Sequence, residues 1–224
     1  MKVIVSHPGK QHAYKLLIAL QQLGIEVTFC TSFALKKQDN YFANRFFGKR
    51  LLINSNVALK TFPILELIRL LGRKIIKPIV AQHYFERTFD RLSSNWLKRQ
   101  EFDIFIGYEC SSRLCFEVCR EMGKVSLLDL AQIHYNELKQ LGKEYECLNY
   151  LLEDGIRSKI DGTKHRELEL CSKILSISSF VKESLLKNNI PKNKIFDLPI
   201  GNKSIVKNIK KRNRINLKSS LLVP

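Results

Sequence analysis

The sequence predicts an α/β protein with a Rossmann-like, mostly parallel, doubly wound sheet and helices on both faces. Three observations lead to this prediction. Short apolar runs led by Val and Ile alternate with segments whose apolar residues recur at helical spacing. The first of these units has very short connections, as in βαβ crossovers. The composition, 45% hydrophobic and 26% charged over 224 residues, is that of a globular protein.

The first βαβ unit is predicted at the start of the chain. Residues 2–6 are an apolar run typical of a buried parallel strand, and a turn containing Gly9 follows. From Tyr14 the apolar residues fall on one helical face, and Gly24 ends this helix. Residues 25–30 supply the next strand.

The middle of the chain is predicted to be helical and basic. Residues 63–71 suit a helix that Gly72 stops, and residues 78–99 suit a long helix with proline in its first turn. Before them, residues 41–47 are short and aromatic, and residues 51–53 could be a strand or the end of a loop.

The alternation of strands and helices returns after residue 100. We expect strands at residues 103–108, 125–128, 174–177 and 195–198. We expect helices from Ser111 or Ser112 to Met122, at residues 136–152 and 163–171, and from Ser178 or Ser179 to Lys187. From Gly201 the sequence loses its periodicity. We therefore expect one Rossmann-like domain over residues 1–200 and a basic linker or loose tail over residues 201–224.

The net charge of +17 is unevenly distributed. Residues 44–99 carry 12 basic and three acidic side chains, and residues 201–224 carry seven basic and no acidic ones. A basic surface attracts phosphate in nucleic acid, anionic lipid or a nucleotide. Aromatic residues are interleaved in residues 44–99, but no nucleic-acid-binding module is visible, and nucleic acid is the least supported partner. Peripheral contact with an anionic membrane and a merely solvated helix face both stay open.

Six cysteines without a C-x-x-C pair disfavour a zinc ribbon or a thioredoxin motif. Cys110, Cys115 and Cys119 invite a metal-binding interpretation, but apolar neighbours on the same helical face favour buried thiols. No secretory signal and no run of 18 apolar residues is visible. We expect a cytoplasmic protein with reduced thiols, bound at most peripherally to the inner face of the membrane.

The loop after the first strand is the first candidate site, because doubly wound sheets bind ligands at the carboxyl ends of their strands. Gly9 allows close backbone approach, and the amides that begin the next helix can hold a phosphate or a sugar hydroxyl. Lys10 and His12 lie in the same loop. The loop is neither G-x-G-x-x-G nor a P-loop, which disfavours a Rossmann NAD domain or an NTPase. An ordinary strand-to-helix turn is an equal alternative.

Glu109, Asp129 and His134 lie at the ends of later strands on the same predicted edge. A neutral His134 could donate one hydrogen bond and accept another, which suits a sugar hydroxyl, or it could be a structural residue of its own loop. Asp129 could orient a partner or cap the strand end. Glu117 stands eight residues after Glu109, but one ends a strand and the other lies on a helix, so we do not expect them to converge.

Five segments also carry a resemblance to a known family. They read VIVSHPGKQH at residues 3–12, FDIFIGYE at 102–109, LDLAQIH at 128–134, ELELCSKILSISSFVK at 167–182, and IPKNKI followed by LPIG within residues 190–201. In order and spacing they resemble the amino-terminal domain of family-4 glycosyltransferases of the GT-B fold. The resemblance covers about residues 1–202.

The resemblance implies transfer of a sugar, with retention, from a nucleotide-sugar donor to an acceptor hydroxyl on a glycan or lipid. It implies no essential metal and no cofactor besides the donor substrate. By this resemblance, the Gly9 loop with Lys10 and His12 faces the donor phosphates and the transferred sugar. His134 would hydrogen-bond the donor sugar or the acceptor as the catalytic residue. Glu109 and Asp129 would belong to the substrate-binding site.

GT-B enzymes have two Rossmann-like domains, and in this family the nucleotide-sugar residues lie mainly in the second. The chain stops soon after the segment that resembles the interdomain linker. We therefore expect the acceptor-side half of a truncated, frameshifted or split enzyme, with a separate carboxy-terminal half as a partner. Whether the chain alone is an enzyme stays open. The competing hypothesis is a non-catalytic module that binds an acceptor or a protein partner.

Overall fold

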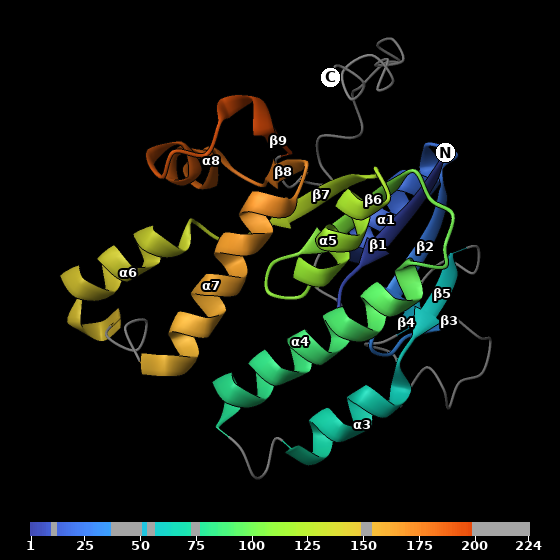
Figure 1. Cartoon of the computed structure of the whole chain (residues 1–224), viewed down its shortest axis with the longest axis horizontal. Helices are drawn as coiled ribbons and strands as arrows, with labels where there is room; N and C mark the ends of the chain where they lie inside the picture. The colour runs from blue at the N-terminus through green and yellow to red at the C-terminus, as the bar shows by residue number, and fades with distance from the viewer. Residues whose placement is uncertain (10–12, 37–50, 53–56, 73–76, 149–153, 199–224) are drawn as a thin grey trace.

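A computed structural model describes residues 1–9, 13–36, 51–52, 57–72, 77–148 and 154–198, and its central feature is a seven-stranded parallel sheet (Figure 1). The strands are β1 Lys2–Ser6, β2 Glu26–Thr31, β5 Ala58–Thr61, β6 Ile104–Tyr108, β7 Val125–Leu130, β8 Lys173–Ser176 and β9 Ile195–Asp197. Two short parallel strands, β3 Leu35–Lys36 and β4 Leu51–Leu52, pair with each other in a second sheet.

The order of the strands across the sheet is β5-β2-β1-β6-β7-β8-β9. Val5 of β1 pairs with Phe29 of β2 on one side and with Ile106 of β6 on the other. The chain first adds strands on one side of β1 and, from β6 onward, adds them on the other side. The boundary between β1 and β6 is therefore the topological switch point, where open α/β sheets bind ligands.

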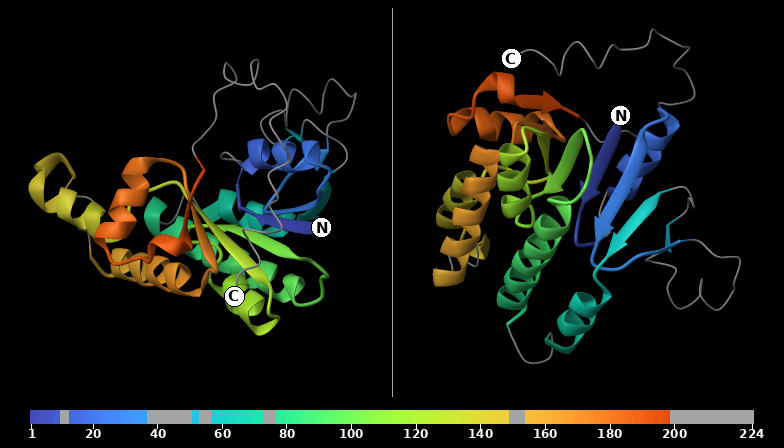
Figure 2. Two further views of the ribbon diagram at one scale, coloured as in Figure 1. Left: turned by 90° about the horizontal axis from the view of Figure 1, so that it is seen from above. Right: turned by 45° about the vertical axis from the view of Figure 1, so that its right-hand side comes forward.

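Helices cover both faces of the sheet (Figure 2). They are α1 Ala13–Gln22, α3 Pro63–Gly72, α4 Pro78–Leu97, α5 Arg113–Glu121, α6 Tyr135–Glu144, α7 Asp154–Leu170 and α8 Ser179–Lys187. On one face, Leu17 of α1 packs with Val5 and Phe29. On the other face, residues of α4, α5, α7 and α8 pack around Phe105 and Leu128. The central strands thus bury apolar side chains on both faces, and the predicted doubly wound α/β fold is confirmed.

Several predicted boundaries were wrong. The helix expected over residues 136–152 ends at Glu144, because Tyr145 adopts an extended backbone (φ −119°, ψ 114°). Helix α7 begins at Asp154 rather than at Thr163. The prediction missed its first turns because they are largely polar. Strand β7 continues to Leu130, and the edge strand β5 was not predicted.

Other expectations concern residues that lie outside the described part of the chain. These are residues 41–47, the end of the 51–53 segment, and the tail from residue 201 onward. Among the described helices, none is long and apolar enough to cross a membrane.

Candidate functional site

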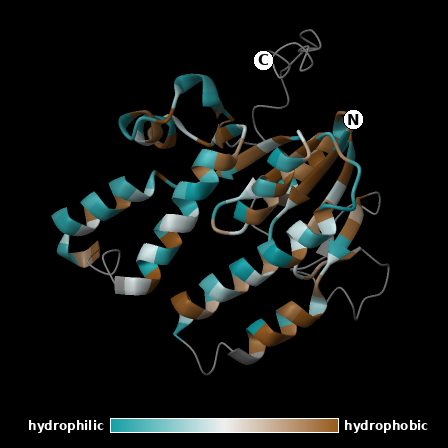
Figure 3. Cartoon of the chain, in the orientation of Figure 1, coloured by the Kyte–Doolittle hydropathy of each residue, from teal (hydrophilic) through white to brown (hydrophobic). Residues whose placement is uncertain are grey.

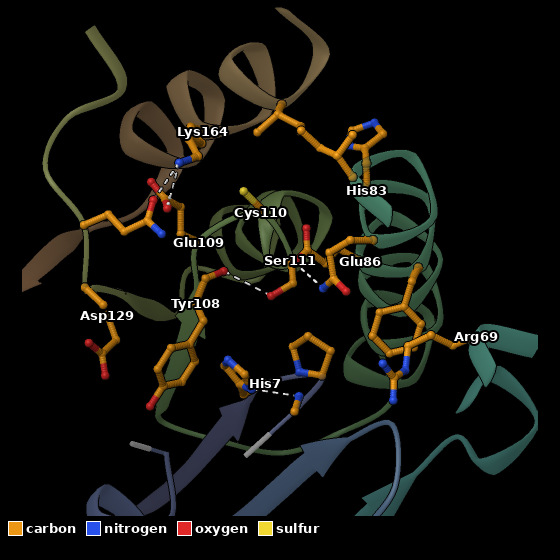
Figure 4. A pocket seen from close by; sticks show the side chains of 18 of the residues that line it. His7, Arg69, His83, Glu86, Tyr108, Glu109, Cys110, Ser111, Asp129 and Lys164 are labelled. Atoms are coloured by element: carbon orange, nitrogen blue, oxygen red, sulfur yellow. Dashed lines mark hydrogen bonds and ion pairs between the residues drawn. The ribbon is translucent and has the colours of Figure 1, made fainter. Parts of the chain in front are cut away.

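A cavity of about 460 Å³ lies at the carboxyl ends of β1, β6 and β7, beside the switch point (Figure 4). The loops after these strands supply one part of its wall. Side chains of α3, α4 and α7 supply the rest. The cavity therefore joins segments that are far apart in the sequence, at the place where the topology predicts a ligand.

The loop after β1 is held by hydrogen bonds to its neighbours. The buried His7 accepts the amide of Gly9 on Nδ1 at 2.8 Å, and its ring meets Tyr108 edge-on with centroids 4.5 Å apart. Ser32 Oγ lies 2.6 Å from the Pro8 carbonyl oxygen. The path of this loop past the cavity is thus determined by contacts with β2 and β6 as well as by its own turn.

The loop after β6 is equally constrained. Gly107 has no room for a side chain, because a Cβ there would lie 2.3 Å from Ser112 Oγ. The sequence suggested that a serine hydroxyl caps α5 here. The Ser112 hydroxyl instead donates to the Tyr108 carbonyl at 2.9 Å. Cys110 has a left-handed backbone (φ 69°), which a non-glycine residue adopts only when its surroundings impose it.

Two buried carboxylates take the place of the expected cap. Glu167 of α7 accepts the amides of Cys110 at 2.7 Å and Ser112 at 2.8 Å. Asp90 of α4 accepts the amides of Leu114 at 2.8 Å and Cys115 at 3.1 Å. The first turn of α5 and the loop before it are therefore held by side chains from two other helices, which satisfies amides that would otherwise be orphaned.

Glu109 and Lys164 form an ion pair of 3.0 Å in the cavity wall. Lys164 Nζ also donates to Gln132 Oε1 at 3.2 Å, so one ammonium joins α7 to the loops after β6 and β7. Burial alone would lower the pKa of Lys164, but Glu109, Cys110 and Asp161 together outweigh it and the pKa is raised. Burial also raises the pKa of Glu109, and the Lys164 ammonium opposes that rise.

Helix α4 contributes two titratable side chains to the cavity. Burial raises the pKa of Glu86 to about 7, although Gln82 Nε2 donates to its carboxylate at 2.7 Å. Burial, together with the positive charges of Arg87 and Lys159, lowers the pKa of the buried His83. Glu86 can thus exchange a proton near pH 7, which is the property required of a general acid or base.

Asp129, the last but one residue of β7, is a buried residue of the cavity wall, near Tyr108. Burial and the Asp129 carboxylate raise the pKa of the Tyr108 hydroxyl, which therefore remains protonated. The cavity combines carboxylate, ammonium, imidazole and hydroxyl groups, a set that suits a ligand rich in hydroxyls.

His134 lies outside the residues that line this cavity. It is the buried N-cap of α6, where its Nδ1 accepts the Asn136 amide at 3.2 Å. Its own amide donates to Ser184 Oγ at 3.0 Å, and its ring lies against that of Tyr135. Burial lowers the pKa of its imidazole.

The structure brings together three of the six residues predicted from the sequence. Gly9, Glu109 and Asp129 line one cavity, whereas Lys10 and His12 lie outside the described residues. The sequence reasoning missed the residues that helices contribute, namely Arg69, His83, Glu86 and Lys164. No motif marks them. The one available signal was that α4 and α7 are long helices in the connections between neighbouring strands of the sequence, α4 between β5 and β6 and α7 between β7 and β8.

Two of the three cysteines that invited a metal-binding interpretation are buried, as their apolar neighbours suggested. Cys115 and Cys119 are fully buried among apolar side chains of the α5 core, and Cys110 lines the cavity instead. Within the described residues no group of three metal-binding side chains converges. Glu117 pairs with Arg113 at 2.9 Å on α5, away from Glu109, as expected.

No family model matches the sequence, and no curated protein matches it. Solved structures do match. TcCGT1 in complex with UDP has a TM-score of 0.59 at 13% identity, over 89% of this chain and 50% of that one. UGT2 of Phytolacca americana, complexed with UDP-2fluoro-glucose and pterostilbene, has a TM-score of 0.56 at 12% identity, over 90% and 54%.

A third likeness is the UDP-GlcNAc 2-epimerase of Methanocaldococcus jannaschii in complex with UDP-GlcNAc and UDP. Its TM-score is 0.51 at 13% identity, over 90% of this chain and 47% of that one. The chain therefore spans about half the length of the structures it resembles. At these identities the likeness concerns the fold alone. The chain has the Rossmann-like fold that makes up one of the two halves of a GT-B protein.

Proposed function

We propose that the chain is the acceptor-side half of a family-4 glycosyltransferase that transfers a sugar from a nucleotide-sugar donor to an acceptor hydroxyl. The observation that carries the proposal is the polar cavity at the switch point of a GT-B-type sheet. Two of the structures that share this fold are complexes with UDP, and one of the two also holds UDP-GlcNAc. The resemblance of the five sequence segments supports the choice of a transferase.

In this proposal the loop around Gly9, with Lys10 and His12, faces the donor phosphates and the transferred sugar. Glu109 and Asp129 accept hydrogen bonds from sugar hydroxyls, and Lys164 holds the Glu109 carboxyl in place. Glu86 takes or gives a proton at the acceptor side, because its carboxyl titrates near pH 7. His134 acts at the donor sugar or the acceptor. No cofactor is assigned besides the donor.

The remaining partners belong to the same proposal. The residues that bind the nucleotide would come from a separate carboxy-terminal half, and the acceptor would be a glycan or a lipid. We also propose a cytoplasmic location. Peripheral contact with an anionic membrane is supported by the 12 basic and three acidic residues of the 44–99 segment.

The experiment is an assay of turnover with and without a second half. The purified chain is incubated with a panel of nucleotide sugars and glycan or lipid acceptors, alone and with the second Rossmann-like half encoded downstream. We expect turnover only with both halves. Glu109→Gln should abolish most of the turnover. Glu117→Gln, the same change at a residue of α5 that does not line the cavity, should not.

Three outcomes would contradict the proposal. Robust turnover by the chain alone would show that it is not merely a half. No downstream half in any frame, with saturable acceptor binding and no turnover, would favour the non-catalytic binding module. A steep salt dependence of binding to nucleic acid, with no binding of sugars, would favour a basic protein that binds nucleic acid.

A further inference from the structure

A second depression in the surface is lined by four cationic side chains. It lies where helices α4, α5 and α7 meet, has a volume of about 430 Å³, and shares no lining residue with the cavity described above. Its lining residues are Arg87, Arg113, Lys159, Gly162, Thr163 and Arg166. None of these six residues is acidic, so this depression, which we call the cationic site, is lined by positive charge alone.

The four cations are brought together by the packing of three helices. Arg87 comes from α4, and Arg113 is the first residue of α5. On α7, Lys159, Thr163 and Arg166 share one face at i, i+4 and i+7 spacing. The three helices pack against one another, and Figure 3 shows hydrophilic colouring on turns of both α4 and α7. The convergence of the charges is therefore a property of the tertiary structure.

Two of the cations are without an acidic partner among the described residues. Arg87 and Lys159 are both exposed, and neither forms an ion pair in that part of the chain. The other two cations each pair with a carboxylate of their own helix, Glu117 at 2.9 Å and Glu169 at 2.8 Å. Neither carboxylate lines the cationic site. Because like charges repel, a site of this composition favours an anion that offsets them.

The buried carboxylates of α4 and α7 offset the cations only in part. Burial raises the pKa of Asp90, and Arg113 is among the groups that oppose this rise. The oxygens of Asp90 and Glu167, however, accept backbone amides of α5 and of the loop before it. Burial and then the charges of the two unpaired cations lower the pKa of His83 in the neighbouring cavity. Their positive charge thus acts on the surroundings in the folded protein.

We propose that the cationic site binds a small ligand through a diphosphate group. Three of its four cations are arginines, whose planar guanidinium groups match the spacing of phosphate oxygens. Two adjoining phosphates carry several negative charges in a small volume, which suits four cations around one depression. A nucleic-acid strand needs basic groups along a groove, and these charges are confined to a single place. The inference goes beyond the proposed function, which places its donor phosphates at the cavity.

The test is isothermal titration calorimetry of the full chain with inorganic diphosphate and with UDP, at constant ionic strength. We expect saturable binding of inorganic diphosphate, and tighter binding of UDP would show that the ligand also carries a nucleoside. Replacing Arg87 and Lys159 together by Gln should weaken binding about tenfold or more, because charge-assisted hydrogen bonds to phosphate are lost.

Gly162→Glu is a second variant, which leaves all four cations in place. A Cβ at Gly162 meets open space, so the added carboxylate can enter the site without displacing its neighbours. This variant should also bind about tenfold more weakly or worse, because the new charge repels the ligand. A matched control replaces an exposed arginine and an exposed lysine elsewhere, Arg120 and Lys143, by Gln and should bind as the wild type does. Thermal melts establish that all three variants are folded.

The titration of His83, followed by NMR, is a second readout that reports on this place in the fold. Bound diphosphate should raise the pKa of His83, because it offsets the charges of Arg87 and Lys159. The rise should be absent from the variant that lacks both cations.

No binding of diphosphate, an unchanged affinity of the two site variants, or an equal loss in the control would overturn the proposal. So would an unchanged pKa of His83 at saturation, or binding of an oligonucleotide through these residues without binding of diphosphate. The transferase proposal fails separately, since it depends on turnover by two halves, whereas this site is tested on the chain alone.

Discussion

Replacing Glu167 by Ala is expected to destabilise the protein by about 2–5 kcal/mol. The carboxylate is fully buried and accepts the amides of Cys110 and Ser112. Each buried amide left without an acceptor costs about 1–3 kcal/mol, and the loss of the carboxylate's own burial cost offsets part of the sum. The stability of Glu167→Gln should lie between those of the wild type and Glu167→Ala, because the glutamine amide group retains one acceptor oxygen.

The assay is urea unfolding at pH 7 of the wild type and both variants, with equal slopes confirming that midpoints compare stability. Glu169→Ala is the control, since Glu169 lies two residues further along the same helix and pairs with Arg166 at the surface. Its midpoint should match that of the wild type. If Glu167→Ala and Glu169→Ala melted at the same urea concentration, the loop before α5 would not depend on Glu167 and the reasoning would be refuted.

Three further predictions concern positions near the same edge of the sheet. Gly107→Ala should destabilise by about 2 kcal/mol or more, because the new Cβ meets Ser112, whereas Gly162→Ala, with open space in α7, should stabilise by about 0.5–1 kcal/mol in the same urea melts. Glu86 has a folded pKa of about 7 against 4.5 ordinarily, so its titration should lower stability by about 1–3 kcal/mol as the pH rises from 4.5 to 7; Glu86→Gln should remove that part of the fall, and an unchanged profile would contradict the assignment. His134→Ala should lower the free energy of unfolding by about 1 kcal/mol, because α6 loses its cap. In the two-half enzyme the same change should also cost about 2–4 kcal/mol of transition-state stabilisation. A large melting shift with normal activity per folded molecule would assign His134 to the scaffold.

Much of the fold could be predicted because it is written in local patterns. A strand covered by helices on both faces must be apolar throughout, and residues 2–6, 103–108 and 174–177 are mainly so. The edge strand β5, which reads Ala-Leu-Lys-Thr, is only partly buried and lacks that signal. The start of α7 was missed for the same reason, because its polar first turns owe their helical state to context rather than to an apolar stripe.

From the sequence one could predict that Gly9, Glu109 and Asp129 share one edge, since the carboxyl ends of parallel strands meet there. Which helical side chains face them depends on how the helices pack over the sheet. Glu86 and Lys164 enter the cavity from α4 and α7, and Glu167 reaches the loop before α5 across 55 residues of chain. The packing angles of helices over a sheet depend on side-chain volumes throughout the core, and no local pattern records which turn of a distant helix will lie above a given strand end.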